Sequence, residues 1–131
     1  FSVVAVSLKT PALTVEKTPF DVALFLRGLD NDWSDGAQNR LRYVGNRVYR
    51  TSKILAAGAD DFKIADSDWG GTTGGATNCG AANPVVIGQP LAIDCSSNSP
   101  NVNFTAPAAG SYVFELTVPQ SGAPSLVVSG P

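Results

Sequence analysis

The chain has 131 residues, of which 44% are hydrophobic and 15% charged, and its formal net charge is −2 at pH 7. These values fit one globular domain, residues 1–131, and argue against a disordered chain. Lys and Arg are not clustered, and no apolar run approaches the roughly 18 residues that a membrane helix needs. We therefore expect neither a nucleic acid nor a membrane as a partner.

The first segment of the chain combines an apolar opening with a stretch that contains two prolines. Its opening, residues 1–8, has no basic region before the apolar run and no cleavage motif after it, so we do not interpret it as a complete signal peptide. Two prolines, Pro11 and Pro19, follow. Because proline disfavours regular strands and helices, residues 1–19 are predicted to form a lead-in or linker.

The first predicted strand covers residues 20–27. Its residues alternate, with Leu24 and Leu26 on one face and Phe25 and Arg27 on the other. An apolar side of this kind is typical of a central strand that packs on the core.

A hairpin is predicted next, from strands at 40–44 and 48–55 joined through Gly45 and Asn46, which accept the positive φ angles of a tight turn. A further strand is predicted at 61–65, and we expect it to extend the hairpin into a meander. Residues 70–80, rich in Gly and Thr, are predicted to form an exposed loop.

The second half of the chain continues with short strand patterns. We predict strands or strand fragments at 84–87, 91–95, 102–105, 111–118 and 126–129. About seven or eight short strands, with a turn every 8–12 residues or so, predict an all-β fold, an antiparallel Ig-like β-sandwich; a small barrel is the alternative.

The two cysteines, Cys79 and Cys95, lie in a stretch dense in Gly, Ser, Asn and Pro. A disulfide between them would stabilise a region with little core by about 3 kcal/mol, and we predict that bond. Two separate buried thiols are the alternative; a metal pair is disfavoured because the chain has no His and no third Cys. A disulfide would indicate a secreted protein, extracellular or periplasmic.

The absence of His from the sequence excludes the Ser-His and Cys-His pairs that activate most hydrolytic nucleophiles. The Gly-rich segment at 70–75 lacks the Lys of a phosphate-binding loop. We therefore expect no catalytic residues, no metal and no cofactor.

Acidic residues need a separate test, because glycoside hydrolysis requires only a pair of carboxyl groups. All the candidates lie in predicted turns, where Asp commonly bonds the local backbone. They are Asp30, Asp32, Asp35, Asp60, Asp61, Asp66 and Asp68. The first three could ligate calcium, but Gly36 stands one place too late for an EF-hand loop, and we interpret all seven as turn residues.

The two tryptophans, Trp33 and Trp69, stand among Asp, Asn, Ser and Gly, without local apolar partners. Each follows a predicted strand by a few residues, so we expect both at the same end of the sandwich. Exposed indole rings can stack on the apolar face of a sugar ring, whereas rings that cap the core would bond a loop carbonyl through the indole N–H. Spacing alone leaves both interpretations open.

Several segments, in order, resemble a known family. Residues 24–33 read LFLRGLDNDW, 62–69 read FKIADSDW, 78–81 read NCGA, and 101–104 and 110–114 read NVNF and GSYVF. Over about residues 20–118 the chain resembles the starch-binding accessory modules of bacterial pullulanases and raw-starch α-amylases. It is more distantly similar to the glycogen-binding domain of the AMP-activated protein kinase β subunit.

The resemblance implies a non-catalytic module that binds an α-glucan polysaccharide or maltooligosaccharide and targets a linked glycoside hydrolase to it. It implies that Trp33 and Trp69 form the sugar platform and that Lys63 and Asn78 reach glucose hydroxyls. Strand alternation agrees for Lys63, which points away from the apolar face of its strand. The chain departs from the family in the insertion at 70–76. The alternative is an Ig-like structural or interaction domain without sugar binding.

Overall fold

The computed structural model describes residues 17–131, so the predicted lead-in at 1–19 lies almost entirely outside the described residues. The described chain is nearly all β, as predicted, with ten strands and two single-turn 3₁₀ helices, η3 (Leu29–Asn31) and η4 (Ala37–Asn39). The strands are β1 (Leu24–Arg27), β2 (Arg40–Gly45), β3 (Val48–Leu55), β4 (Gly58–Ala65), β5 (Asn78–Gly80), β6 (Leu91–Ala92), β7 (Asp94–Cys95), β8 (Val102–Ala106), β9 (Gly110–Thr117) and β10 (Ser125–Ser129). No helix within this range is long and apolar enough to cross a membrane.

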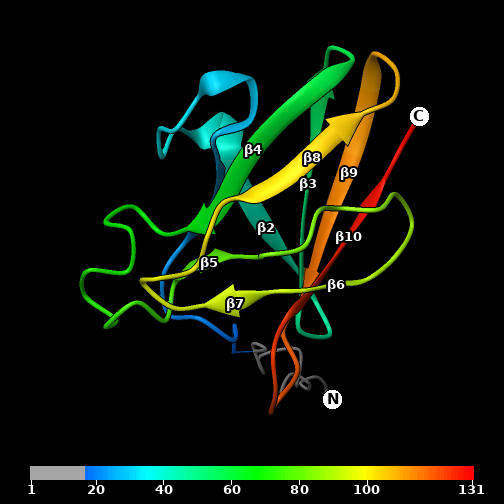
Figure 1. Cartoon of the computed structure of the whole chain (residues 1–131). Coiled ribbons are helices and arrows are strands. Elements are labelled where there is room, and N and C mark those ends of the chain that lie inside the picture. The colour runs from blue at the N-terminus through cyan, green and yellow to red at the C-terminus, as the bar shows by residue number, and fades with distance from the viewer. Residues whose placement is uncertain (1–16) are drawn as a thin grey trace, which may run out of the picture.

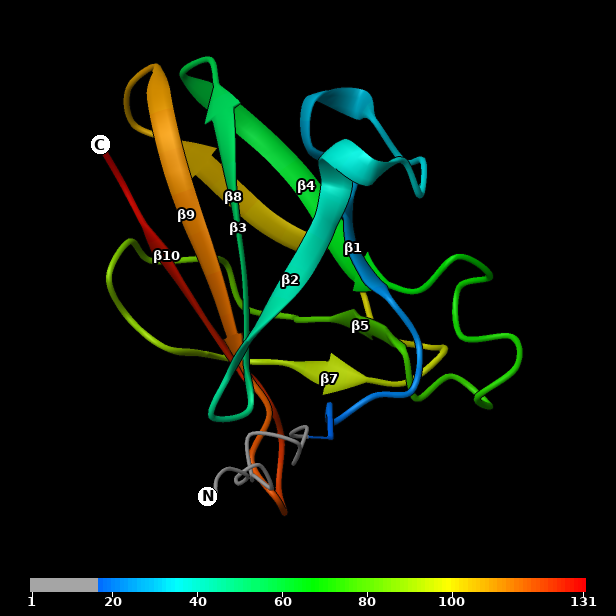
Figure 2. The ribbon, with the colours of Figure 1, turned by 180° about the vertical axis from the view of Figure 1, so that it is seen from behind.

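The strands form two antiparallel layers that share β2, which gives a nearly closed sandwich (Figures 1 and 2). One layer runs β6-β10-β9-β3-β2 and the other runs β2-β1-β4-β5-β7, with β8 paired to β4. In Figure 1, β4 and β8 lie in front of β3 and β9. The predicted antiparallel sandwich is therefore the observed architecture, with two-residue strands raising the strand count.

The predicted hairpin is present, and its turn residues Asn46 and Arg47 have positive φ angles of 53° and 65°. The predicted meander is wrong. After Leu55 the chain crosses to the other layer, where β4 pairs with β1 and β8. The second edge of β3 pairs instead with β9, through eight consecutive residue pairs. The predicted strand at 61–65 is too short to form as many pairs with β3.

Alternating residues from both layers form the core. Tyr112, Phe114 and Leu116 of β9 are fully buried, as are Phe62 and Ile64 of β4. The Phe62 and Phe114 rings meet edge to face with their centroids 5.6 Å apart. Burial of each such side chain contributes about 1.5–3 kcal/mol, so β4 is held firmly against the opposite layer.

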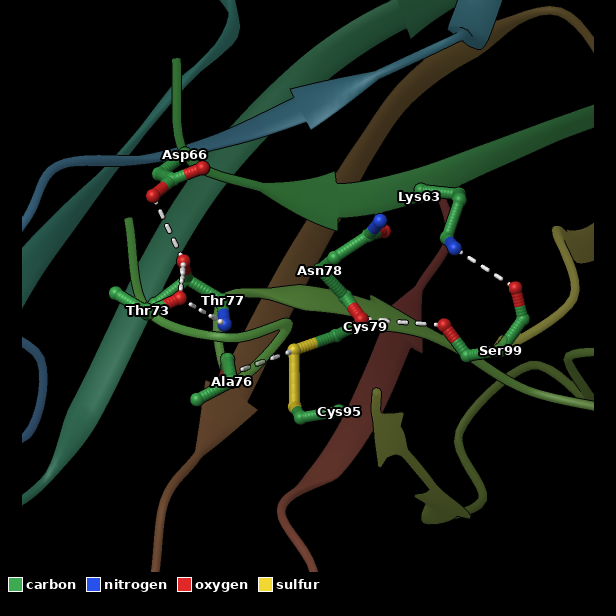
Figure 3. The surroundings of a disulfide bond; sticks show 9 residues. All are labelled: Lys63, Asp66, Thr73, Ala76, Thr77, Asn78, Cys79, Cys95 and Ser99. Atoms are coloured by element: carbon green, nitrogen blue, oxygen red, sulfur yellow. Dashed lines mark hydrogen bonds between the residues drawn. A yellow bond between two sulfur atoms is a disulfide. The ribbon is translucent and has the colours of Figure 1, made fainter. Parts of the chain in front are cut away.

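The disulfide joins Cys79 and Cys95, which face each other in β5 and β7 with their Cα atoms 4.0 Å apart (Figure 3). β7 lies at the edge of its layer and has two paired residues. The covalent bond therefore secures a strand that backbone hydrogen bonding alone would hold weakly.

Candidate functional site

The floor of the candidate site is the outer face of β1, β4 and β5. Arg27 lies opposite Lys63 in the β1–β4 ladder, and Ala65 lies opposite Asn78 in the β4–β5 ladder. Because side chains alternate along a strand, Arg27, Lys63, Ala65 and Asn78 share one face, and Ile64 points the other way into the core. The outward direction of Lys63 thus agrees with the alternation in the sequence.

Two loops cover this floor, and each carries one tryptophan. β1 and β4 are antiparallel, so the loops that follow them, residues 28–39 and 66–77, leave from opposite ends of the pair. Both lie on the left-hand side of the molecule in Figure 1. The half-buried rings of Trp33 and Trp69 meet with centroids 6.2 Å apart and planes at 40°. We call these two rings the indole pair; they are close together, but not through a shared end of the sandwich.

The Trp33 ring rests against Gly28. This glycine has a φ of 127°, and a Cβ built on it would lie 2.8 Å from Cη2 of Trp33 and 2.9 Å from Cα of Phe62. Only a residue without a side chain leaves room for the indole there. Ser34 follows the ring and donates its amide and hydroxyl to the carboxylate of Asp32 at 3.1 Å and 2.7 Å, and these bonds hold the pKa of Asp32 well below its usual range.

Trp69 sits in a tight turn with a φ of 58°, a left-handed conformation that is costly for a large side chain. The buried carboxylate of Asp66 stabilises this turn. It accepts the Gly70 amide at 2.7 Å and the Thr77 hydroxyl at 2.7 Å, so both ends of the loop are tied to one group. Charge-assisted bonds of this kind are among the stronger ones in a protein.

The Gly-rich insertion folds back instead of extending into solvent. The Gly75 amide donates to the Gly70 carbonyl at 2.9 Å, and a Cβ on Gly75 would lie 2.7 Å from the Ser97 nitrogen. On its outer side, the hydroxyl and amide of Thr72 bond the carboxylate of Asp68, and the hydroxyl bond lowers the pKa of this carboxyl. The insertion therefore leaves β5 in register with β4.

Arg27 connects both loops. Its Nε donates to the Trp33 carbonyl at 2.7 Å, and its Nη1 donates to the carbonyls of Asp66 at 2.7 Å and Ser67 at 3.2 Å. Its guanidinium carbon lies 3.8 Å from the centroid of the Trp69 ring. Arg27 is 7% exposed, so one face of Trp69 is covered by a buried cation.

Lys63 and Asn78 are diagonal neighbours on β4 and β5, and Figure 3 shows both beside the disulfide. The Lys63 amine donates to the Ser99 carbonyl at 2.7 Å and is 7% exposed; burial lowers its pKa and the charge of Asp94 opposes that shift. Within the described residues, Oδ1 of Asn78 is buried and accepts no hydrogen bond. An ammonium donor and a buried amide acceptor without a partner thus lie on neighbouring strands of the same face.

Several of the acidic residues accept hydrogen bonds from other parts of the chain. Asp60 accepts the amide of Asp30 at 2.8 Å, and Asp61 accepts the side-chain amide of Asn101 at 2.9 Å. Across residues 17–131, no group of three or more His, Cys, Asp and Glu could hold a metal ion. The turn interpretation is wrong for Asp60 and Asp61, which lie within β4 because that strand begins at Gly58, three residues before the predicted start.

Sequence reasoning did not place Arg27 or Gly28 in the site. The alternation of β1 puts Arg27 on the face opposite Leu26, and that pattern was available. The partners of Arg27 were not, since they are carbonyls of loops 6 and 39 or 40 residues further along the chain.

No protein-family model matches the chain, and no curated protein matches it. Among solved structures, the fold is similar to the "Ligand induced structure of AmyP-SBD", an AmyP starch-binding domain, with a TM-score of 0.64. The two chains share 22% identity, and the match covers 99% of this chain and 95% of that one. At this level of identity the likeness shows a common fold.

Proposed function

We propose that this chain is a non-catalytic module that binds α-glucans such as starch, glycogen and maltooligosaccharides. The observation that carries the proposal is the indole pair: two partly exposed rings, 6.2 Å apart, held over the floor of β1, β4 and β5. Isolated tryptophans in polar loops need no explanation, but two that are tightly held and adjacent form a surface suited to a flat apolar ligand.

A pyranose ring is such a ligand, because its C–H face is apolar while its edge carries hydroxyl groups. The planes of Trp33 and Trp69 are inclined by 40°. An inclined pair suits the curved chain of an α-glucan better than the flat ribbon of cellulose. Rings that are already fixed also bind at a lower cost in ordering entropy.

Polar groups for the hydroxyls lie close by. The Lys63 amine uses one donor on Ser99 and keeps others, and Oδ1 of Asn78 offers an acceptor that no protein group occupies within residues 17–131. In the proposed complex, Lys63 donates to a glucose hydroxyl and Asn78 accepts from one. Oδ1 of Asn78 is buried in the free protein, so its bond to a glucose hydroxyl requires the side chain to turn toward the ligand.

The likeness to AmyP-SBD supports this choice of ligand, since that protein is a starch-binding domain of the same fold. The absence of His supports a binding role over catalysis. We further propose that the module acts beside a linked glycoside hydrolase of the pullulanase or amylase type. The Cys79–Cys95 disulfide favours a secreted location, because such bonds persist in oxidising compartments.

The test is retention on polysaccharide. In gels that contain glycogen or amylose, Trp33→Ala and Trp69→Ala should each lose the retardation of the parent protein. By titration with maltoheptaose, each should raise Kd roughly tenfold or more, since a stacking contact is worth about 1–3 kcal/mol.

Ile54→Ala is the matched control, because Ile54 is an apolar side chain that is 85% exposed on β3, outside the site. It should bind like the parent. Cellulose serves as the control polymer and should retain none of the proteins. Unchanged retention of both tryptophan variants would reject the proposal and favour an Ig-like domain without sugar binding.

A further inference from the structure

We propose that Arg27 is a positioning residue whose guanidinium fixes the distance and inclination of the indole pair. Arg27 lies in β1, outside both tryptophan loops, and contacts both of them. The claim about ring geometry stands without any ligand; its consequence for glucan affinity rests on the proposed function.

Arg27 contacts the two loops through different atoms of its guanidinium. Nε and Nη1 of Arg27 point in different directions, one to the Trp33 carbonyl and one to the carbonyls of Asp66 and Ser67. The guanidinium lies over the Trp69 ring, with Cζ 3.8 Å from the centroid. The rigid, planar guanidinium therefore sets the distance between the two loops. The ammonium group of a Lys has no such fixed geometry and could not do so.

The charge of Arg27 is buried among groups that belong to the two loops. Arg27 is 7% exposed, and among the described residues no carboxylate lies within 4.0 Å of its guanidinium. A buried charge is costly unless its donors are satisfied, and here backbone carbonyls and an aromatic face satisfy them. Each of these partners belongs to a loop that carries an indole, so the interactions that keep Arg27 buried also hold those loops.

Each tryptophan also has a support that does not involve Arg27. Trp33 is otherwise supported by its contact with Gly28, and Trp69 is held through the bonds of Asp66 to its neighbours. Apart from the contact of the two rings with each other, neither support links one ring to the other. With Arg27 replaced, each loop keeps its own anchor, but the relative placement of the rings is no longer fixed.

Two indoles at this separation should couple electronically and give an exciton couplet in far-ultraviolet circular dichroism, measured without sugar. Trp33→Phe should abolish the couplet and so assign it to the pair. We expect Arg27→Lys to lose most of the couplet and to weaken maltoheptaose binding on the order of tenfold. Arg50→Lys, which alters an exposed ion pair with Glu115, should change neither.

A couplet that survives in folded Arg27→Lys would overturn the proposal, as would a parent protein whose couplet does not depend on Trp33. A role in stability alone would lower the melting temperature and leave the couplet intact, which also counts against positioning. If the parent does not bind maltoheptaose, the glucan proposal fails, and the couplet of Arg27→Lys still decides the role of Arg27.

A second measurement covers the case in which Arg27→Lys does not fold. In the NMR spectrum of the parent, the side-chain protons of Arg27 should be shifted upfield by the ring current of Trp69, and its Nε–H should exchange slowly with solvent. Trp69→Leu should remove the shift. Unshifted, rapidly exchanging Arg27 protons in the parent would refute the contact.

Discussion

Breaking the Cys79–Cys95 bond tests how far the edge of the sandwich supports the site. The bond closes a loop with a sequence separation of 16, and β7 is otherwise joined to β5 through two paired residues. On the loop-entropy model the bond contributes about 3 kcal/mol to the free energy of unfolding. For a chain of this length, such a loss lowers the melting temperature by on the order of 10 °C.

The loss should also be local. Ile93 remains anchored, since its amide donates to the Pro124 carbonyl at 2.9 Å and its side chain is 2% exposed. The segment beyond Cys95, residues 96–100, contributes no apolar side chain to the core, and it is held through hydrogen bonds such as that of the Lys63 amine to the Ser99 carbonyl. Amide hydrogen exchange should therefore accelerate most at 94–100, and glucan affinity should fall in parallel.

The assay compares calorimetric melting of the Cys79→Ala/Cys95→Ala double variant with that of the parent protein, with and without a phosphine reductant. Reduced parent keeps both sulfur atoms in place, so it separates the bond from the cavity that the alanines leave at the fully buried Cys79. A midpoint within about 2 °C of the oxidised parent in both cases would refute the reasoning.

Two further outcomes follow from the loops. Gly28→Ala should destabilise the fold by roughly 2–4 kcal/mol in denaturant titration, because the added Cβ would lie 2.7 Å from the Asp61 carbonyl and 2.8 Å from Trp33 at a φ of 127°; a smaller loss than about 1 kcal/mol would contradict the packing. Thr72→Val should raise the pKa of Asp68 toward the ordinary value of about 3.9, followed by NMR titration of the carboxyl. Since the folded-state pKa of Asp68 is depressed, its contribution to stability is present above the unfolded pKa and is lost as pH falls through the folded one. The variant, with its folded pKa closer to the unfolded one, should be less stable near neutral pH and should lose less stability on acidification. An unchanged titration curve would show that the hydroxyl is not the cause.

Strand alternation and turn chemistry were sufficient where the contacts are local. The alternating apolar residues around Phe114 predicted β9 to within a residue at each end, and Gly45 with Asn46 located the hairpin. The predicted strand at 91–95 illustrates the limit. The chain changes partners at Ile93: it pairs with β10 before this residue and with β5 after it. A pattern of five residues does not indicate which distant strands it will pair with.

The candidate site divides in the same way. The composition around Trp33 and Trp69 predicted rings with few local apolar neighbours, and both are half-buried. Their meeting depends on loops that return from opposite ends of β1 and β4, which the sequence did not predict. The run at 84–87 was predicted as a strand or strand fragment because it is apolar; no strand forms there, and Val86 is 60% exposed.

Because the guanidinium of Arg27 covers one face of Trp69, only the other face of that ring is available for a ligand to stack on. Such a surface suits the outermost strands of a packed granule, which expose a single flank to water, and it would release a strand by simple lifting, without unthreading. On the proposed function, contact of this kind would let the module leave one position on the solid and bind at another.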